Sequence, residues 1–135
     1  MSSDEQEPVK TICPYCGVGC GIKVNPGDEP GDMRFMPWGD APVNDGRVCI
    51  KGGAATEVVD HEDRLTDPLI KEDGEFREAG WDEALSYIVD ELERIREEHE
   101  PDAMGFFGSS KTMNEENYLL QKLARRYGTN NVDNC

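Results

Sequence analysis

The chain has 135 residues, enough for one domain or for a small domain with part of a second. Asp and Glu number 29 against 14 Lys and Arg, and the resulting net charge of −15 excludes nucleic acid and anionic membranes as partners. Hydrophobic residues are only 36% of the chain, so the apolar core is modest and a buried metal group would add stabilising cross-links.

The first half of the chain predicts small antiparallel strands. Residues 1–8 are acidic and are expected to be disordered. From Val9 onward, short apolar pieces at residues 9–12, 21–24 and 33–36 alternate with clusters of Pro, Gly and Asp that predict turns. A short helix is expected at residues 52–59, although its two leading glycines disfavour helix.

Four cysteines occur among these strands in the pattern C-x2-C-x3-C-x28-C, at Cys13, Cys16, Cys20 and Cys49. Three thiolates on one glycine-rich loop can bind three corners of a [4Fe–4S] cluster, and a distant fourth can bind the last corner. Gly17, Gly19 and Gly21 allow the backbone to wrap closely around an inorganic core. The pattern therefore predicts an iron–sulfur site.

Zinc and disulfides are the alternatives to the cluster. Structural zinc sites usually pair two short two-cysteine hooks, whereas here three cysteines share one hook and one stands alone. The chain has an odd number of cysteines, 5, and its N-terminus lacks the basic and apolar regions of a signal peptide. With no apolar run long enough to span a membrane, we expect a cytoplasmic protein with reduced thiols and no membrane insertion.

The second half of the chain predicts alternating helices and strands. Apolar residues at helical spacing predict a helix over residues 81–99 with Gly80 as its N-cap, and Pro101 ends it. A buried strand is expected at residues 103–107. A second helix, with a capping box at residues 112–115, continues to Gly128, and another strand begins near residue 131. This order implies an α/β unit with parallel strands that is cut off as it starts.

The loop of residues 108–112 joins a predicted strand to a predicted helix. A nucleotide-triphosphate loop is disfavoured because Ser110, instead of glycine, precedes Lys111. Binding of another phosphate or diphosphate ligand by the loop stays open, since ligands of α/β proteins gather at strand C-termini. Elsewhere, we expect Trp81, Tyr118 and Tyr127 to pack in or at the edge of a core, and the two histidines, His61 and His99, to be solvated.

The acidic balance has three interpretations: an ordinary solvated surface, docking to a basic partner, or adaptation to a high-salt cytoplasm. Acidic residues are spread over the whole chain instead of forming one tail. This distribution favours a halophilic protein.

Three stretches in order resemble the N-terminus of the catalytic subunit of molybdopterin-dependent oxidoreductases: residues 13–20, residues 46–52 (Gly-Arg-Val-Cys-Ile-Lys-Gly) and residues 81–85. Residues 105–118 and 128–133 resemble formate dehydrogenase in particular. Assimilatory nitrate reductase shares the cysteine run and is the second candidate in the family. Gly80 stands where the family often has serine, a change that costs only tenths of a kcal/mol.

The resemblance implies that Cys13, Cys16, Cys20 and Cys49 hold a [4Fe–4S] cluster and that Lys51 relays electrons between the cluster and a pterin. It implies a molybdenum or tungsten bis(molybdopterin guanine dinucleotide) in the full-length enzyme. Gly108, Ser109 and Ser110 are then candidate pterin-binding residues. The family's metal-ligating cysteine or selenocysteine has no counterpart here, because Cys135 precedes that position, and no catalytic residue is expected in this chain.

We therefore expect an α+β protein: a disordered segment at residues 1–8, a β-rich [4Fe–4S] domain at residues 9–70, and an incomplete molybdopterin-oxidoreductase α/β domain at residues 71–135. The predicted function is the electron-transfer portion of a formate dehydrogenase, with formate as substrate and an electron-acceptor subunit, a ferredoxin or an NAD-linked protein as partner. The sequence also leaves open a stand-alone ferredoxin-like module and, less favoured, a zinc-stapled interaction domain.

Overall fold

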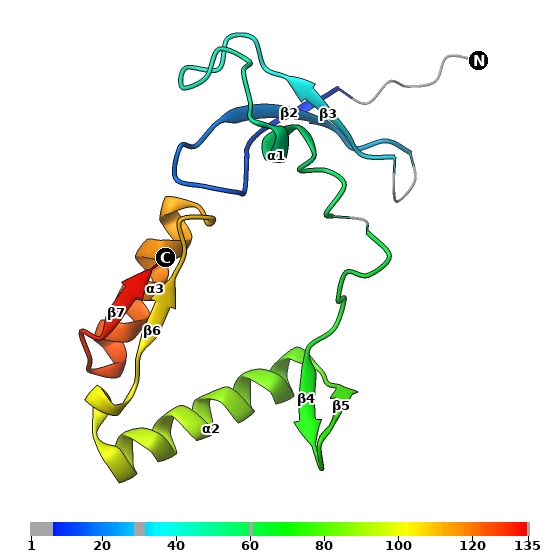
Figure 1. Ribbon diagram of the computed structural model, residues 1–135. Coiled ribbons are helices and arrows are strands. Elements are labelled where there is room, and N and C mark those ends of the chain that lie inside the picture. The colour runs from blue at the N-terminus through cyan, green and yellow to red at the C-terminus, as the bar shows by residue number, and fades with distance from the viewer. Residues whose placement is uncertain (1–6, 29–31, 60, 135) are drawn as a thin grey trace. The chain divides into compact units, whose positions relative to one another are not determined.

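The computed structural model describes residues 7–28, 32–59 and 61–134, and divides the chain into two compact units (Figure 1). The first unit contains the chain up to Arg64 together with Gly108–Leu119, and the second contains Leu65–Phe107 and Leu120–Asp133. Of the segment expected to be disordered, residues 1–6 lie outside the described residues. The mixture of small sheets and helices confirms the predicted α+β class.

The sheet of the first unit is antiparallel, and its strands lie in the order β1 (Val9–Ile12), β2 (Gly21–Asn25), β3 (Arg34–Pro37). Thr11 lies opposite Ile22, and Val24 lies opposite Phe35. Ile22 is 2% exposed and belongs to the small core of this unit. The three predicted strands are confirmed, with the third one residue later than expected.

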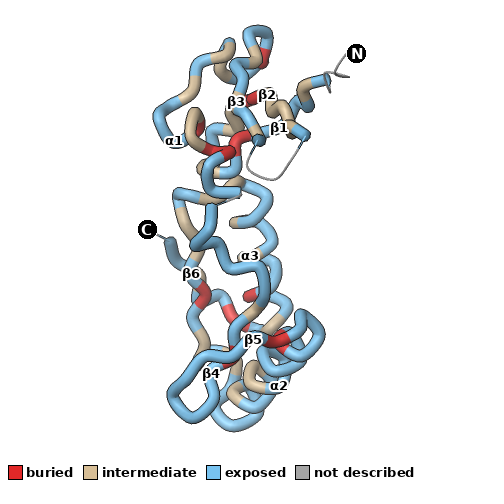
Figure 2. The backbone as a smooth tube through the Cα atoms, turned by 90° about the vertical axis from the view of Figure 1, so that its right-hand side faces the viewer, coloured by how far each residue is buried: buried red, intermediate tan, exposed pale blue. Residues whose placement is uncertain are grey.

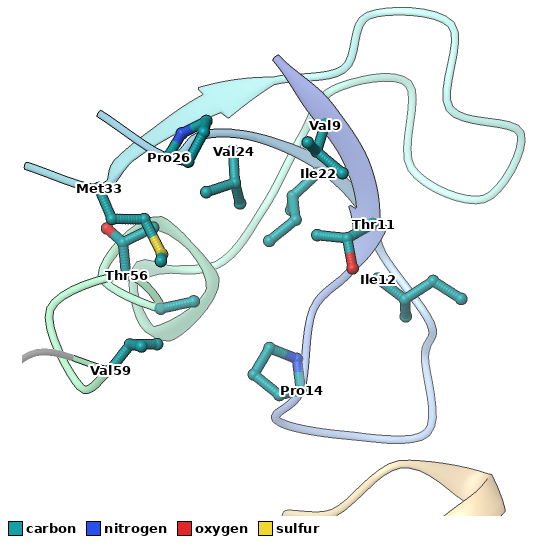
Figure 3. A pocket seen from close by; sticks show the side chains of 11 residues that line it. Val9, Thr11, Ile12, Pro14, Ile22, Val24, Pro26, Met33, Thr56 and Val59 are labelled. Carbon is teal, nitrogen blue, oxygen red and sulfur yellow. The ribbon is translucent and has the colours of Figure 1, made fainter. Parts of the chain in front are cut away.

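One face of this sheet borders an apolar pocket of about 440 Å³ (Figure 3). Its wall includes Ile22 and Val24 from β2, with Ala55 and Val59 from the turns that follow Cys49. None of the four predicted ligand cysteines lines it. The pocket therefore lies on the apolar side of the sheet and reaches the cysteine loop only at Pro14.

The short helix of this unit, α1, spans Ile50–Gly53, and only turns follow it. The helix expected at residues 52–59 is therefore wrong. Helical structure begins directly after Cys49, where the Gly53 and Ala54 N–H groups donate to the Cys49 and Ile50 carbonyls at 3.1 and 3.2 Å. Gly52 and Gly53 thus end the helix instead of beginning it, consistent with their low helix propensity.

The second unit begins with a hairpin that the sequence analysis did not predict. Strand β4 (Leu69–Glu72) pairs antiparallel with β5 (Glu75–Glu78). Asp73 and Gly74 form the two-residue turn with φ angles of 50° and 90°. Positive φ at both central residues is the signature of the hairpin turn that Asp-Gly favours. Buried side chains beside the hairpin form a small apolar cluster: Ile70, Ala79 and Ala84.

Helix α2 spans Trp81–His99 with Gly80 at its N-cap, as predicted. Glu100, with φ of 65°, ends the helix, and Pro101–Ala103 forms the 3-10 helix η1. The strand expected at residues 103–107 is displaced to β6, Phe106–Gly108. The reason is that the turn starting at Pro101 uses Ala103 and Met104, whose N–H groups donate back to Glu100 and Pro101.

Strands β6 and β7 (Val132–Asn134) form a two-stranded sheet, and helix α3 (Asn114–Tyr127) connects them. Their arrows point the same way in Figure 1, as the predicted parallel unit requires. Gly128, with φ of 118°, ends α3 as expected.

The predicted capping box of α3 is wrong by one residue. The Glu116 carboxylate accepts from the Met113 N–H at 2.8 Å, whereas the Thr112 hydroxyl donates to the Ser109 carbonyl at 3.1 Å. The helix begins later than the box at residues 112–115 implies, because Thr112 is used by the preceding loop.

Burial is sparse, and Figure 2 shows buried residues as short separate segments. Trp81 is 66% exposed and Tyr118 is 63% exposed, so the packing expected of these two aromatics is wrong for the described chain. Tyr127 does pack: its ring meets Phe106 edge to face at 5.7 Å, and its hydroxyl donates to the Leu92 carbonyl. His61 and His99 are exposed, as expected.

Candidate metal centre

The loop between β1 and β2 carries the first three cysteines. The Cys13 N–H donates to the Cys20 carbonyl at 2.8 Å, which closes the loop at its base. Within it, the Gly19 N–H donates to the Cys16 carbonyl at 3.4 Å, and Gly19 has φ of 70°. That backbone conformation is easy for glycine and strained for other residues. The predicted need for glycine in this loop is therefore met at Gly19.

The fourth cysteine, Cys49, is exposed and is the N-cap residue of α1. Gly52, on the same helix, is buried against Cys13: a Cβ built on Gly52 would lie 3.5 Å from the Cys13 Sγ and 3.2 Å from the Val48 Cβ. A side chain at position 52 would thus fill the space beside the Cys13 sulfur. The close approach brings the helix after Cys49 against the cysteine loop.

Two asparagines, which the sequence analysis did not single out, bind the backbone of the cysteine loop. Asn44 accepts from the Gly21 N–H at 2.8 Å and donates to the carbonyls of Gly21 and Arg47 at 3.2 and 2.8 Å. Asn114, at the start of α3, donates to the Gly17 carbonyl at 2.9 Å. Asn44 is 23 positions from Gly21 in the sequence, and Asn114 is 97 positions from Gly17. No local sequence pattern predicts contacts over such separations.

Cys20 and Cys49 have pKa values shifted in opposite directions. Burial raises the pKa of Cys20, and the charges of Cys13, Cys16 and Cys49 raise it further. The pKa of Cys49 is lowered because the backbone N–H groups of Gly52 and Lys51 donate to its sulfur and stabilise the thiolate. The effect of these charges places Cys13, Cys16 and Cys49 within electrostatic reach of Cys20.

The donor set fits an iron–sulfur cluster. All four cysteines are free thiols, and a [4Fe–4S] cluster takes four cysteine thiolates, one at each iron. As the described side chains stand, no group of three or more His, Cys, Asp or Glu could hold a metal ion. The repulsion among the thiolates would be relieved by a cationic iron core placed between them.

Lys51 lies on α1, two residues after Cys49, and its side chain is exposed. Its positive charge contributes to lowering the pKa of Cys49. The structure therefore places the predicted relay lysine beside the fourth predicted ligand.

The loop that holds Gly108, Ser109 and Ser110 is folded around its own polar groups. The Ser109 N–H donates to the Asn117 side chain at 3.2 Å, and the Lys111 N–H donates to the Ser109 hydroxyl at 3.0 Å. The Lys111 ammonium lies 3.2 Å from the Ser110 hydroxyl. These two amides are thus already engaged within the chain, so a phosphate or pterin would have to meet other groups of the loop.

A hollow of about 380 Å³ links this part of the chain to the cysteine loop. Pro14 and Tyr15 line it from the cysteine loop, and Lys111, Thr112 and Glu116 line it from the loop before α3 and the first turn of that helix. The structure therefore brings the residues just after the predicted pterin loop to one surface with the loop that carries three predicted cluster ligands.

Two family models match the chain in succession. The model described as molybdopterin oxidoreductase Fe4S4 domain matches residues 7–61, and the model described as molybdopterin oxidoreductase matches residues 64–135. Together they cover both halves of the chain, in the order that the sequence resemblance implied.

Curated relatives include proteins named "Putative formate dehydrogenase" from Staphylococcus aureus strains USA300 and MW2. Each is 46% identical over 136 residues, covering 100% of this chain and 14% of the relative. The chain thus spans about a seventh of the length of these relatives. Among solved structures, acetylene hydratase from Pelobacter acetylenicus has a similar fold, with a TM-score of 0.67 and 22% identity over 93% of this chain and 18% of that one.

Proposed function

Because the chain belongs to the molybdopterin oxidoreductase family, we propose that it is the [4Fe–4S] electron-transfer portion of a formate dehydrogenase. The observation that carries this proposal is the 46% identity, over the full chain, to relatives bearing that name. The family models support a [4Fe–4S] cluster and a molybdenum or tungsten pterin as the cofactors. In this proposal, the pterin centre of the full-length enzyme would supply the oxidation of formate to CO₂, and the cluster would supply electron transfer away from it.

Cys13, Cys16, Cys20 and Cys49 are the proposed cluster ligands. Their support is the closed loop that carries three of them, the approach of Gly52 to the Cys13 sulfur, and the effect of the charges of Cys13, Cys16 and Cys49 on Cys20. When bound, the cluster would supply one-electron transfer. The protein's own contribution is to supply the four thiols and to stabilise the thiolate of Cys49, whose pKa the Lys51 and Gly52 amides lower.

Lys51 is the proposed relay residue. Its cation lies near an anionic ligand, and such a charge favours the reduced state of a nearby redox group.

The residues Gly108, Ser109 and Ser110 are proposed to contact the pterin. Since the Ser109 and Lys111 amides are occupied and both serine hydroxyl oxygens accept from Lys111, we assign that contact to the O–H donors of the serines and to the remaining backbone groups.

The partner and the surroundings of the chain are proposed on coarser grounds. We propose a cytoplasmic enzyme that passes electrons to an acceptor subunit, a ferredoxin or an NAD-linked protein, because the proposed cluster needs a redox partner. Within the described residues, no helix is both long and apolar enough to cross a membrane. The net charge of −15, spread over the chain, supports adaptation to high salt.

Anaerobic reconstitution with iron and sulfide tests the cluster. About four irons and four sulfides should bind per chain, and a cysteine-to-serine variant at a proposed ligand should bind less. One tightly held zinc with no sulfide would favour a zinc-stapled domain instead.

Substitution of Lys51 tests the relay role in the full-length enzyme. Lys51→Ala should leave the iron content intact and slow formate-dependent reduction of the cluster, whereas Lys51→Arg, which keeps the charge, should be less affected. Unchanged electron transfer in Lys51→Ala would contradict the role.

The substrate is tested on the full-length enzyme. Reduction of nitrate by that enzyme, with no oxidation of formate, would point to the nitrate reductase branch.

A further inference from the structure

The two cysteine segments are held together by a side chain that is not a ligand. Between Cys20 and Cys49 lie 28 residues. The position of the Cys49 thiol relative to the other three therefore depends on contacts between distant parts of the chain. The Asn44 amide bridges the two segments: it binds Gly21, next to Cys20, and Arg47, two residues before Cys49.

The bridge uses most of the hydrogen-bonding capacity of the amide. Its Oδ1 accepts from the Gly21 N–H at 2.8 Å, and its Nδ2 donates to the Gly21 carbonyl at 3.2 Å and to the Arg47 carbonyl at 2.8 Å. An amide has two N–H donors and one carbonyl acceptor, so this pattern needs asparagine chemistry specifically. A carboxylate could accept from Gly21 but could not donate to either carbonyl.

Both ends of the bridge are held by the surrounding chain. A Cβ built on Gly21 would lie 2.7 Å from the Trp38 ring and 2.8 Å from the Cβ of Ala41, which is completely buried, so Gly21 is packed tightly. The Arg47 N–H in turn donates to the Asn44 carbonyl at 2.8 Å. The amide therefore connects two segments that are themselves ordered.

We propose that Asn44 is a positioning residue that sets the place of Cys49 relative to the three-cysteine loop. The inference rests on the proposed cluster and goes beyond it, since it assigns the position of the fourth ligand to a residue that does not position the other three. The loop of Cys13, Cys16 and Cys20 is closed by its own Cys13–Cys20 backbone bond, which does not involve Asn44. Loss of the Asn44 hydrogen bonds should therefore displace the Cys49 thiolate from the cluster and leave the other three cysteine ligands in place.

The expected chemistry is loss of one iron. Breaking the bond between the Cys49 sulfur and its iron frees a thiolate, which takes up a proton from water, and the iron leaves as Fe²⁺ with no net oxidation or reduction. In Asn44→Asp the Gly21 and Arg47 carbonyls would face a carboxylate in place of a donor. This variant should therefore displace Cys49 more than simple removal of the side chain in Asn44→Ala.

The test compares five proteins after anaerobic reconstitution of the full chain: wild type, Asn44→Asp, Asn44→Ala, Cys49→Ser and Asn25→Asp. Iron and sulfide are counted before and after exposure to EDTA, and Mössbauer spectra identify the cluster type. We expect both Asn44 variants, like Cys49→Ser, to fall to about three irons for every four sulfides, since one of the four corner ligands is out of place.

Asn25→Asp is the matched control. Asn25 accepts from the Gly27 N–H at 3.0 Å within one turn, and a carboxylate keeps that acceptor. Its iron content should equal that of the wild type.

The outcomes separate the two hypotheses. If the wild type binds no four-iron cluster, the proposed function fails. If the wild type binds the cluster and both Asn44 variants keep it equally well in EDTA, the positioning role is overturned. Circular dichroism checks the fold: an Asn44→Ala chain that loses its secondary structure, or that keeps it and binds no iron at all, also overturns the proposal, because positioning of one ligand predicts three remaining irons.

Discussion

Gly21 shows how tightly single residues are packed at the end of the cysteine loop. A Cβ at this position would meet the Trp38 ring and the buried Ala41, neither of which is a flexible chain end. We expect Gly21→Ala to lower the free energy of unfolding by about 1–3 kcal/mol, the usual cost of overpacking. Urea unfolding followed by circular dichroism measures it.

Gly39→Ala is the control for that substitution, since a Cβ at Gly39 meets nothing within 4 Å. Equal unfolding midpoints for the Gly21 and Gly39 variants would contradict the packing argument.

Two of the cysteines should differ in reactivity when the chain is free of metal. The pKa of Cys49 is lowered by the Gly52 and Lys51 amides, and the pKa of Cys20 is raised by burial and by the other thiolates. Because the thiolate is the reactive form, iodoacetamide should label Cys49 at lower pH than Cys20. Labelling against pH, read by mass spectrometry of peptides, checks the order.

The denatured chain provides the reference for this labelling, because both thiols should then titrate alike. Labelling of Cys20 at a lower pH than Cys49 in the folded chain would contradict the assignment of these shifts.

At the scale of elements, Arg77 ties the β4–β5 hairpin to the first turn of α2. Its guanidinium lies 2.7 Å from the Glu72 carboxylate and 2.6 Å from the Glu83 carboxylate. The hydrogen bonds to Arg77 lower the pKa of both glutamates. The two ion pairs therefore stabilise the folded chain fully at pH values above the ordinary glutamate pKa of about 4.3. This stabilisation is lost as the pH falls through the lowered pKa values that the two glutamates have in the folded chain.

Arg77→Met should therefore reduce stability at neutral pH, and its difference from the wild type should shrink as the solution is acidified. Hydrogen exchange of the Ala79 amide, which donates to Pro68 at 2.9 Å beside the hairpin, reports the local effect. Because all three side chains are exposed, the effect is small. Arg94→Met is the control: Arg94 pairs with Glu91 and Glu98 within α2 and should not alter Ala79 exchange.

The helices and strands also show which sequence signals are strong enough to predict an element and its bounds. The bounds of α2 follow from apolar periodicity over nineteen residues and from Pro101, signals strong enough to predict it. The hairpin was missed although Asp73-Gly74 is a typical hairpin turn, because its strands are mostly exposed and lack a clear alternation. The helix near Cys49 was misplaced because four residues carry almost no periodicity.

At the scale of the whole molecule, the charge of −15 predicts a dependence on salt. Repulsion among carboxylates opposes a compact chain, and salt shortens its range from about 10 Å at 0.1 M to about 3 Å at 1 M. We expect the chain to be more compact and to retain iron better in molar KCl than at low salt. Small-angle scattering and iron analysis across a KCl series measure this.

A double variant, Glu93→Lys with Glu97→Lys, provides the comparison, because both residues are exposed on α2. It should need less salt than the wild type. Identical compactness and iron content at every KCl concentration would contradict adaptation to high salt.

The sequence by itself determined the family, the α+β class, the main helices and the identity of the candidate ligands. The family followed from the resemblance of whole sequence stretches, and the other features followed from cysteine spacing, glycine placement and apolar periodicity, which are local properties of the chain. Only the tertiary structure decided which side chains join distant segments: Asn44 to both cysteine segments, Asn114 to Gly17, and Gly52 to the Cys13 sulfur. An asparagine amide looks the same in any loop, and its role depends on which backbone groups the fold brings within reach of it.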